Sequence, residues 1–223
     1  MKKRTLLLSC LLVLCALLAA CGPSNSVRLL PVTPEKTVLP SPSAATVTVV
    51  KFDDKRPDPS SIGLRRDKSY FTTTDDAREW TGRAAANALT AQGFKVAYAG
   101  TTAEAIKGKP DYMLTGSLRD ITITEDSISS FTTTVTVKYA LANSQKTLLT
   151  ETLSSSQTHT GLPSSSAVET CLRQTLAEIV KSMAIKVADR PGRLAAFAPF
   201  LFPGRWAGKP ALRPPPFLQP GAP

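Results

Sequence analysis

The sequence predicts an α+β fold, an α/β-like two-layer arrangement in which two main helices pack on a mixed sheet with an antiparallel C-terminal meander. Three patterns indicate this fold. Strand-like runs and helical patterns alternate up to residue 110, three strand-like segments follow one another over 111–158, and an apolar stripe at helical spacing comes last. Together they predict one domain over residues 46–189.

The first half of this domain is predicted to contain a strand and then a helix. Thr46–Phe52 is a β-branched run that ends in charged residues and Pro57, and a polar loop follows it. Thr74–Asp76 offers a helix cap and an acidic first turn. After it, Trp80 and several alanines fall on one face, and Gly93 ends the helix.

The middle of the domain is predicted to return to strands. Phe94–Tyr98 is strand-like, and Thr101–Glu104 resembles a capping box for one helical turn through Ile106. A long strand follows over Tyr112–Thr124, but its apolar alternation changes parity part-way. Because a slip of one residue turns side chains to the opposite face, we expect a bulge near Arg119–Asp120.

The C-terminal part is predicted to close the core. Apolar residues alternate with polar ones over 131–141, Ala142–Gln145 is a turn, and Lys146–Thr158 is a strand rich in Ser and Thr. Ser164–Ser166 offer caps for a last helix with one apolar stripe. Cys171 lies on that stripe, where a small buried hydrophobe is the simplest role and a reactive thiol the alternative.

The N-terminus resembles the signal peptide of a bacterial lipoprotein. Lys2, Lys3 and Arg4 precede an apolar run, and Leu18-Ala19-Ala20-Cys21 follows as a lipobox. We therefore expect residues 1–20 to be a signal peptide and Cys21 to be fatty-acylated, which attaches the protein to a membrane. Gly22 in place of Asp favours the outer membrane of a two-membrane bacterium, with the domain facing the periplasm. An ordinary secretory signal with an incidental cysteine is the alternative.

Two segments are predicted to lack regular structure. Residues 21–45, rich in Pro and Ser, are expected to be a flexible tether, although Val27–Leu30 is an apolar island able to dock on the domain. Residues 190–223 hold nine of the 18 prolines and are expected to be a disordered Pro/Arg/aromatic-rich tail. This tail is a membrane-touching segment, a proline-rich ligand or an accessory extension.

The net charge of +10 does not predict nucleic-acid binding, because it belongs mainly to the ends of the chain. Three positive charges precede Cys21 and five lie in residues 190–223, so that residues 21–189 carry a net charge of only +2. Of the four cysteines, Cys10 and Cys15 leave with the signal peptide and Cys21 is acylated. Cys171 then has no partner for an intramolecular disulfide.

The sequence offers little catalytic chemistry. His159 is the sole histidine, and although Ser154–Ser156 precede it closely, nothing marks a serine as activated. We predict no catalytic residue, no metal site and no cofactor, since phosphate-binding and zinc motifs are also missing. Asp53, Asp54 and Arg56 are predicted as a structural or interaction loop, in which Asp53 and Arg56 form a local ion pair.

The chain resembles the YajG family of small bacterial lipoproteins over residues 17–189. The residues that carry the resemblance are the lipobox at Cys21, Val47–Arg56, Ile62-Gly63, Leu89–Phe94 and Pro110–Leu118. The resemblance implies an envelope lipoprotein of poorly defined role with no known catalytic residues. The segment after Asp189 departs from the family pattern.

These observations predict a non-catalytic, lipid-anchored envelope lipoprotein whose small domain binds periplasmic or outer-membrane partners, with the identity of the protein partner left open. An auxiliary subunit of an export or lipid-transport complex is the first alternative, and a hydrolase of cell-envelope substrates is the second. The Ser/Thr-rich strands offer an edge for strand addition by a partner, and the alternative is that they are solvated faces.

Overall fold

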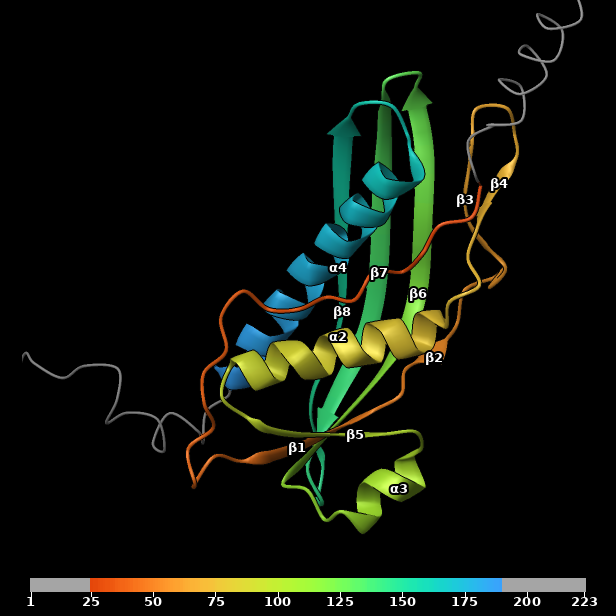
Figure 1. Ribbon diagram of the computed structural model, residues 1–223. Coiled ribbons are helices and arrows are strands. Elements are labelled where there is room, and N and C mark those ends of the chain that lie inside the picture. The colour runs from red at the N-terminus through yellow and green to blue at the C-terminus, as the bar shows by residue number, and fades with distance from the viewer. Residues whose placement is uncertain (1–24, 190–223) are drawn as a thin grey trace, which may run out of the picture. The chain divides into compact units, whose positions relative to one another are not determined.

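Strand β6, Tyr112–Ser127, organises the sheet in the computed structural model, which describes residues 25–189 (Figure 1). On one side, β6 pairs with the antiparallel strand β7, Ser130–Ala142. Strand β7 in turn pairs, also antiparallel, with β8, Thr147–Thr160. On its other side, β6 pairs in parallel with β1 (Thr46–Val50), β2 (Asp53–Asp54) and β3 (Ser61–Leu64), one after another along its length. The predicted mixed sheet with a C-terminal meander is therefore confirmed.

Two further strands widen the sheet at opposite ends. Near the start of β6, β5 (Lys95–Ala99) pairs in parallel with β1. Near the end of β6, β4 (Tyr70–Thr72) forms an antiparallel hairpin with β3. The expected polar loop after Pro57 thus contains two strands, and that prediction is wrong. Each strand is short and has a single fully buried side chain, Ile62 or Phe71, which leaves almost no alternation to recognise.

The two long helices, α2 and α4, cover one face of the sheet and confirm the two-layer prediction (Figure 1). Helix α2, Ala77–Ala91, packs against β1, β5 and β6, whereas α4, Ser165–Ala188, packs against β7, β8 and α2. Between them lies the core, which includes Trp80 and Leu89 of α2, Leu172 and Leu176 of α4, and Phe131 and Val135 of β7. The short helix α3, Thr102–Lys107, packs its Ala105 against Val50 of β1, Ala99 of β5 and Met113 of β6, in a small cluster separate from the main core.

Local signals in the sequence set several boundaries as predicted. Asp76 caps α2 by accepting from the backbone N–H groups of Arg78 and Glu79, and Ser164 caps α4. Gly93, just past α2, has φ +81°, a conformation that favours glycine. The pairing of β6 with β7 shifts register between Leu118 and Asp120, where the bulge was expected. The first strand ends at Val50, two residues earlier than predicted.

Residues 25–32 correct the prediction of a flexible tether over 21–45 and bear out the suggestion that the apolar island Val27–Leu30 docks on the domain. Val27, Leu29 and Val32 belong to the hydrophobic core, and the segment crosses α2 and α4 as an extended strap (Figure 1). Trp80 Nε1 donates to the Leu30 carbonyl (2.7 Å). The prediction fails there because α2 supplies an apolar surface and a donor for a chain segment that lacks secondary structure of its own. The domain therefore begins at least twenty residues before its predicted start at residue 46.

Three predicted features lie outside the described residues: the signal peptide, Cys21 and the tail over 190–223. Among the helices of residues 25–189, none combines the length and apolar content needed to cross a bilayer.

Candidate functional site

Arg56 and Asp54 form the centre of the predicted interaction loop. Arg56 Nη2 donates to Asp54 Oδ2 (2.7 Å) and Nε donates to Asp54 Oδ1 (3.0 Å), which makes the pair bidentate. The Arg56 side chain is only 4% exposed, and it also donates to the carbonyls of Pro59 and Ser61. Arg56 therefore holds together the loop that connects β2 to β3.

The predicted pairing of Arg56 with Asp53 is wrong. The Asp53 side chain is 72% exposed, and its nearest basic group is Lys55 at 4.0 Å. The reason is alternation in β2: neighbouring residues point to opposite sides of a strand, so only Asp54 turns towards Arg56. The Arg56 side-chain hydrogen bond lowers the pKa of the Asp54 carboxyl below its usual value.

A second charged cluster, which the sequence did not reveal, lies where β1 ends and α2 begins. Lys51 Nζ donates to Asp76 Oδ2 (2.6 Å) and lies 3.8 Å from Glu79 Oε2. Arg78 Nε donates to Asp76 Oδ1 (3.0 Å), and this bond is the main cause that lowers the pKa of Asp76 well below its usual range. The carboxyl end of a parallel strand is a common place for ligands in α/β sheets.

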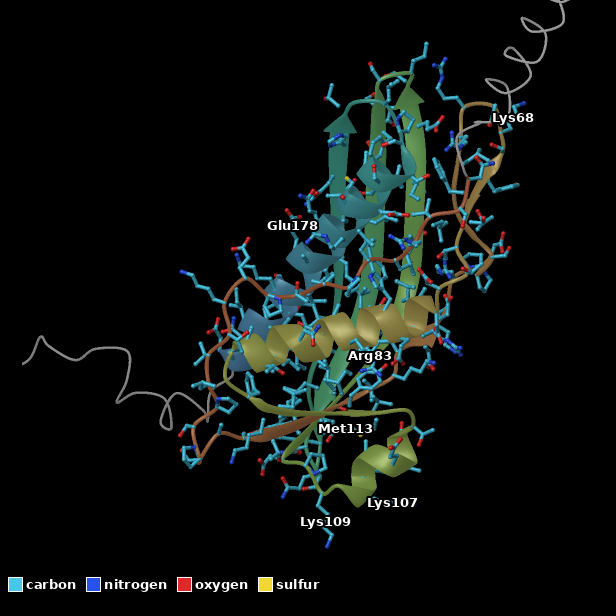
Figure 2. The ribbon with its side chains drawn as sticks, in the orientation of Figure 1. Lys68, Arg83, Lys107, Lys109, Met113 and Glu178 are labelled. Carbon is cyan, nitrogen blue, oxygen red and sulfur yellow. The ribbon has the colours of Figure 1, made fainter. Side chains whose placement is uncertain are left out.

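Tyr98 connects this cluster to β5. Its hydroxyl donates to Glu79 Oε2 (2.9 Å), while the Arg83 guanidinium lies 4.9 Å from the centre of its ring. Figure 2 shows Arg83 on α2, on the side of the helix nearer β5. Partial burial, followed by the bond to Glu79, raises the pKa of the Tyr98 hydroxyl. Each carboxylate of the cluster has a basic partner, so the cluster ties α2 to β1 and β5.

His159 and the three nearby serines do not converge. His159 lies at the exposed end of β8 and packs its ring against Phe131, with ring centres 5.2 Å apart. Ser155 donates to Glu178 Oε2 (2.6 Å), Ser154 pairs with Thr136, and Ser156 pairs with Thr134. These three hydroxyls are thus engaged with groups other than the imidazole.

Cys171 is buried, as the apolar stripe predicted. It is 3% exposed, and its Sγ lies 3.1 Å from Thr133 Oγ1 inside the interface between α4 and β7. Within residues 25–189, no group of three or more His, Cys, Asp or Glu side chains is placed to hold a metal ion.

Strand β8 has an open edge. Within the part of the chain that the structure describes, β8 pairs with β7 alone. Its 14 residues contain neither Pro nor Lys, the residues that commonly protect an edge strand from further pairing. The side that faces away from the helices is a row of exposed hydroxyl side chains: Thr150, Thr152, Ser154, Ser156, Thr158 and Thr160.

No family model and no curated protein matches the chain. Among solved structures, protein XCC0632 from Xanthomonas campestris, of family DUF330, is 16% identical with a TM-score of 0.50, covering 70% of this chain and 92% of that one. The PelC dodecamer from Paraburkholderia phytofirmans is 18% identical with a TM-score of 0.40, covering 66% and 92%. Lipoprotein GNA1162 from Neisseria meningitidis is 17% identical with a TM-score of 0.36, covering 66% and 99%.

The likeness to XCC0632 shows that this fold is shared by a solved bacterial protein. Membership of the YajG family remains a prediction from the sequence.

Proposed function

We propose that this chain is a lipid-anchored, non-catalytic lipoprotein of the bacterial envelope that presents its α+β domain to a protein partner. The observation that carries the proposal is Leu18-Ala19-Ala20-Cys21, placed directly after a basic start and an apolar run. The described domain begins only four residues after this cysteine, at Asn25. In a two-membrane bacterium the anchor lies in the outer membrane and the domain faces the periplasm.

The absence of catalysis is part of the proposal, and the described side chains support it. His159 packs on Phe131 rather than meeting a serine, and the thiol of Cys171 is enclosed by the core. The charged groups around α2 and the Arg56 loop neutralise one another at hydrogen-bonding distance. A general acid or base needs a proton position open to substrate, which paired groups of this kind do not provide.

The open edge of β8 is the surface best suited to a protein partner. An exposed edge presents backbone N–H and C=O groups that an extended segment of another protein can pair with. The row of Ser and Thr hydroxyls beside that edge, three of them bonded to hydroxyls of β7, keeps the surface polar and flat. We therefore assign the partner's contact to β8, with an extended peptide segment as the bound element.

The anchor is tested by Cys21→Ser with metabolic labelling by a fatty-acid analogue. The parent chain is expected to incorporate label and to sediment with membranes, whereas the Cys21→Ser chain is expected to do neither. Cys171→Ser is the matched control, because it removes a cysteine without touching the anchor. Equal labelling of the Cys21→Ser chain and the parent overturns the proposal.

The partner surface is tested by crosslinking in cells from a photoreactive residue at Thr152, on β8. An equivalent residue at Lys107, on α3, is the control. The captured partner is expected at position 152 and not at position 107, and Ser156→Lys is expected to weaken the capture by placing a charge beside the edge. Equal capture at both positions contradicts a contact at β8. Identification of the captured protein as a subunit of an export or lipid-transport complex would favour the alternative function, that of an auxiliary subunit of such a complex.

A further inference from the structure

The path of residues 25–27 determines where a lipid at Cys21 holds the domain. Thr72 N donates to the Asn25 carbonyl (3.0 Å) and Val27 N donates to the Thr72 carbonyl (2.9 Å), so that Ser26 forms a parallel bridge with Thr72 at the end of β4. Because the bridge is parallel, the chain enters it from the side of the loop between β3 and β4.

The free length between the anchor and the domain is short. Three residues separate Cys21 from Asn25, and the four Cα-to-Cα steps between them span at most about 14 Å in a fully extended chain. The interfacial layer on each side of a bilayer's hydrocarbon core is itself roughly 5–8 Å thick. An acylated Cys21 therefore leaves the Ser26–Thr72 bridge close to the lipid headgroups, instead of suspending the domain on a long tether.

Three connections lie at the same end of the molecule as this bridge, and we call them the anchor end (Figure 1). They are the loop between β3 and β4 (residues 65–69), the turn between β6 and β7 (128–129) and the loop between β8 and α4 (161–164). Arg66 N donates to Glu125 Oε2 on β6 (3.2 Å), and Gly161 N donates to the Ser129 carbonyl (2.8 Å). The first bond joins the β3–β4 loop to the end of β6, and the second joins the β8–α4 loop to the β6–β7 turn.

The anchor end exposes large apolar side chains. Tyr70 is 59% exposed, Ile128 72% and Leu162 71%, and Leu64 is exposed opposite Tyr70 in the β3–β4 hairpin. Exposed Tyr beside aliphatic residues suits the boundary between headgroups and acyl chains, where an aromatic ring has both apolar and polar surroundings.

The charges of the anchor end are compatible with a lipid surface. Arg66 and Lys68 are exposed in the β3–β4 loop, and Figure 2 shows Lys68 at the tip of that loop. Asp67 lies between them and accepts from Ser69, while Asp126, near the end of β6, accepts from Thr132 of β7. Since these charges nearly balance, any attraction of this end to a membrane comes from the apolar side chains and the short connection to Cys21 rather than from net charge.

We propose that the anchor end lies directly against the phospholipid surface and that β6 carries the rest of the domain away from it. Sixteen residues of β6 at about 3.3 Å each span roughly 50 Å, so α3 lies at the far end from the bilayer. The open edge of β8 then runs away from the membrane along its whole length. This orientation rests on the acylation of Cys21 under the proposed function.

The experiment uses the acylated chain in vesicles of phosphatidylethanolamine and phosphatidylglycerol that contain a lipid with a nitroxide on its headgroup. A fluorophore is attached in turn to Lys68→Cys, Ile128→Cys and Leu162→Cys at the anchor end, and to Lys107→Cys and Lys109→Cys near α3 as controls (Figure 2). Cys171 is buried, and the parent chain checks that it takes up no label.

Quenching is expected to be several-fold stronger at positions 68, 128 and 162 than at 107 and 109. Equal quenching at both ends, or stronger quenching near α3, overturns the orientation. A spacer of about 20 Gly and Ser residues between Ser24 and Asn25 raises the mean reach of the tether to about 25 Å and is expected to reduce quenching at position 68. Unchanged quenching with the spacer also overturns the proposal.

Failure of the orientation is distinguished from failure of the anchor by mass spectrometry on the same sample. A chain that floats with vesicles and carries the acyl mass on Cys21, but shows no difference in quenching, refutes the orientation alone. A chain without the acyl mass refutes the lipid anchor itself.

Discussion

Gly116→Ala tests the close packing of a buried aromatic ring on the sheet. A Cβ added at Gly116, on β6, would lie 2.4 Å from Cε2, 2.5 Å from Cζ and 2.7 Å from Cδ2 of the Phe52 ring. The ring is 1% exposed and lies on the short stretch between β1 and β2, both of which pair with β6. The ring would therefore have to move by about 1 Å without space to receive it.

Overpacking of this kind costs about 1–3 kcal/mol, and the buried ring places Gly116→Ala near the upper limit. Chemical denaturation of the Cys21→Ser chain, which carries no lipid, measures the free energy of unfolding. Gly108→Ala is the matched control, since its Cβ would meet only the Ala105 carbonyl at 3.4 Å. That variant is expected to change the free energy of unfolding by less than about 0.5 kcal/mol.

A double-mutant cycle isolates the contact. Phe52→Leu replaces the ring by a smaller aliphatic side chain and makes room for a Cβ at position 116. The double variant is therefore expected to lose less free energy of unfolding than the sum of the two single losses, by about 1 kcal/mol or more. A Gly116→Ala chain as stable as the parent, or a cycle with no coupling, would refute the close packing of Phe52 on β6.

Three further predictions concern the strap, the ion pair and the thiol. Leu29→Ala is expected to lower the free energy of unfolding by about 2–3 kcal/mol and to speed proteolysis of residues 25–32. Leu39→Ala, at an exposed position, is expected to change neither. Equal effects of the two substitutions would mean that the strap is not docked. Asp54→Asn leaves the buried Arg56 charge unpaired and is expected to cost about 3 kcal/mol near neutral pH. The folded-state pKa of Asp54 lies below the unfolded value of 3.8, so this cost shrinks as pH falls below about 4. A difference in the free energy of unfolding between parent and Asp54→Asn that does not change with pH would contradict this expectation. Cys171 is expected to resist thiol reagents in the native chain and to react in denaturant, as followed by mass spectrometry; rapid native labelling would exclude its burial.

Regular elements were predictable where the residues of one segment carry the signal themselves. The apolar stripe and Ser164 of α4, the cap of α2 at Asp76 and the change of parity in β6 each depend on neighbours in the chain. Local propensity and side-chain alternation act over a few residues, so a single sequence contains them.

The interaction loop was predictable only in part. The sequence indicated that Asp53, Asp54 and Arg56 act together, but the choice of Asp54 as partner depends on which side of β2 faces the buried guanidinium. The cluster around Tyr98 and Glu79 joins residues 19 apart and arises only when β5 is placed beside β1.

By itself, the sequence determined the two-layer fold and the buried position of Cys171, because these depend on residue type and local spacing. The lipobox at Cys21 comes from the same kind of local pattern and stays a prediction. The sequence marked Val27–Leu30 as able to dock, but only the tertiary structure decided that residues 25–32 form a strap. An irregular segment becomes ordered only when another element offers it apolar surface and hydrogen-bond partners. That docking places the start of the described domain at Asn25, close in the chain to Cys21. The proposed orientation of the domain at a membrane depends on this short separation.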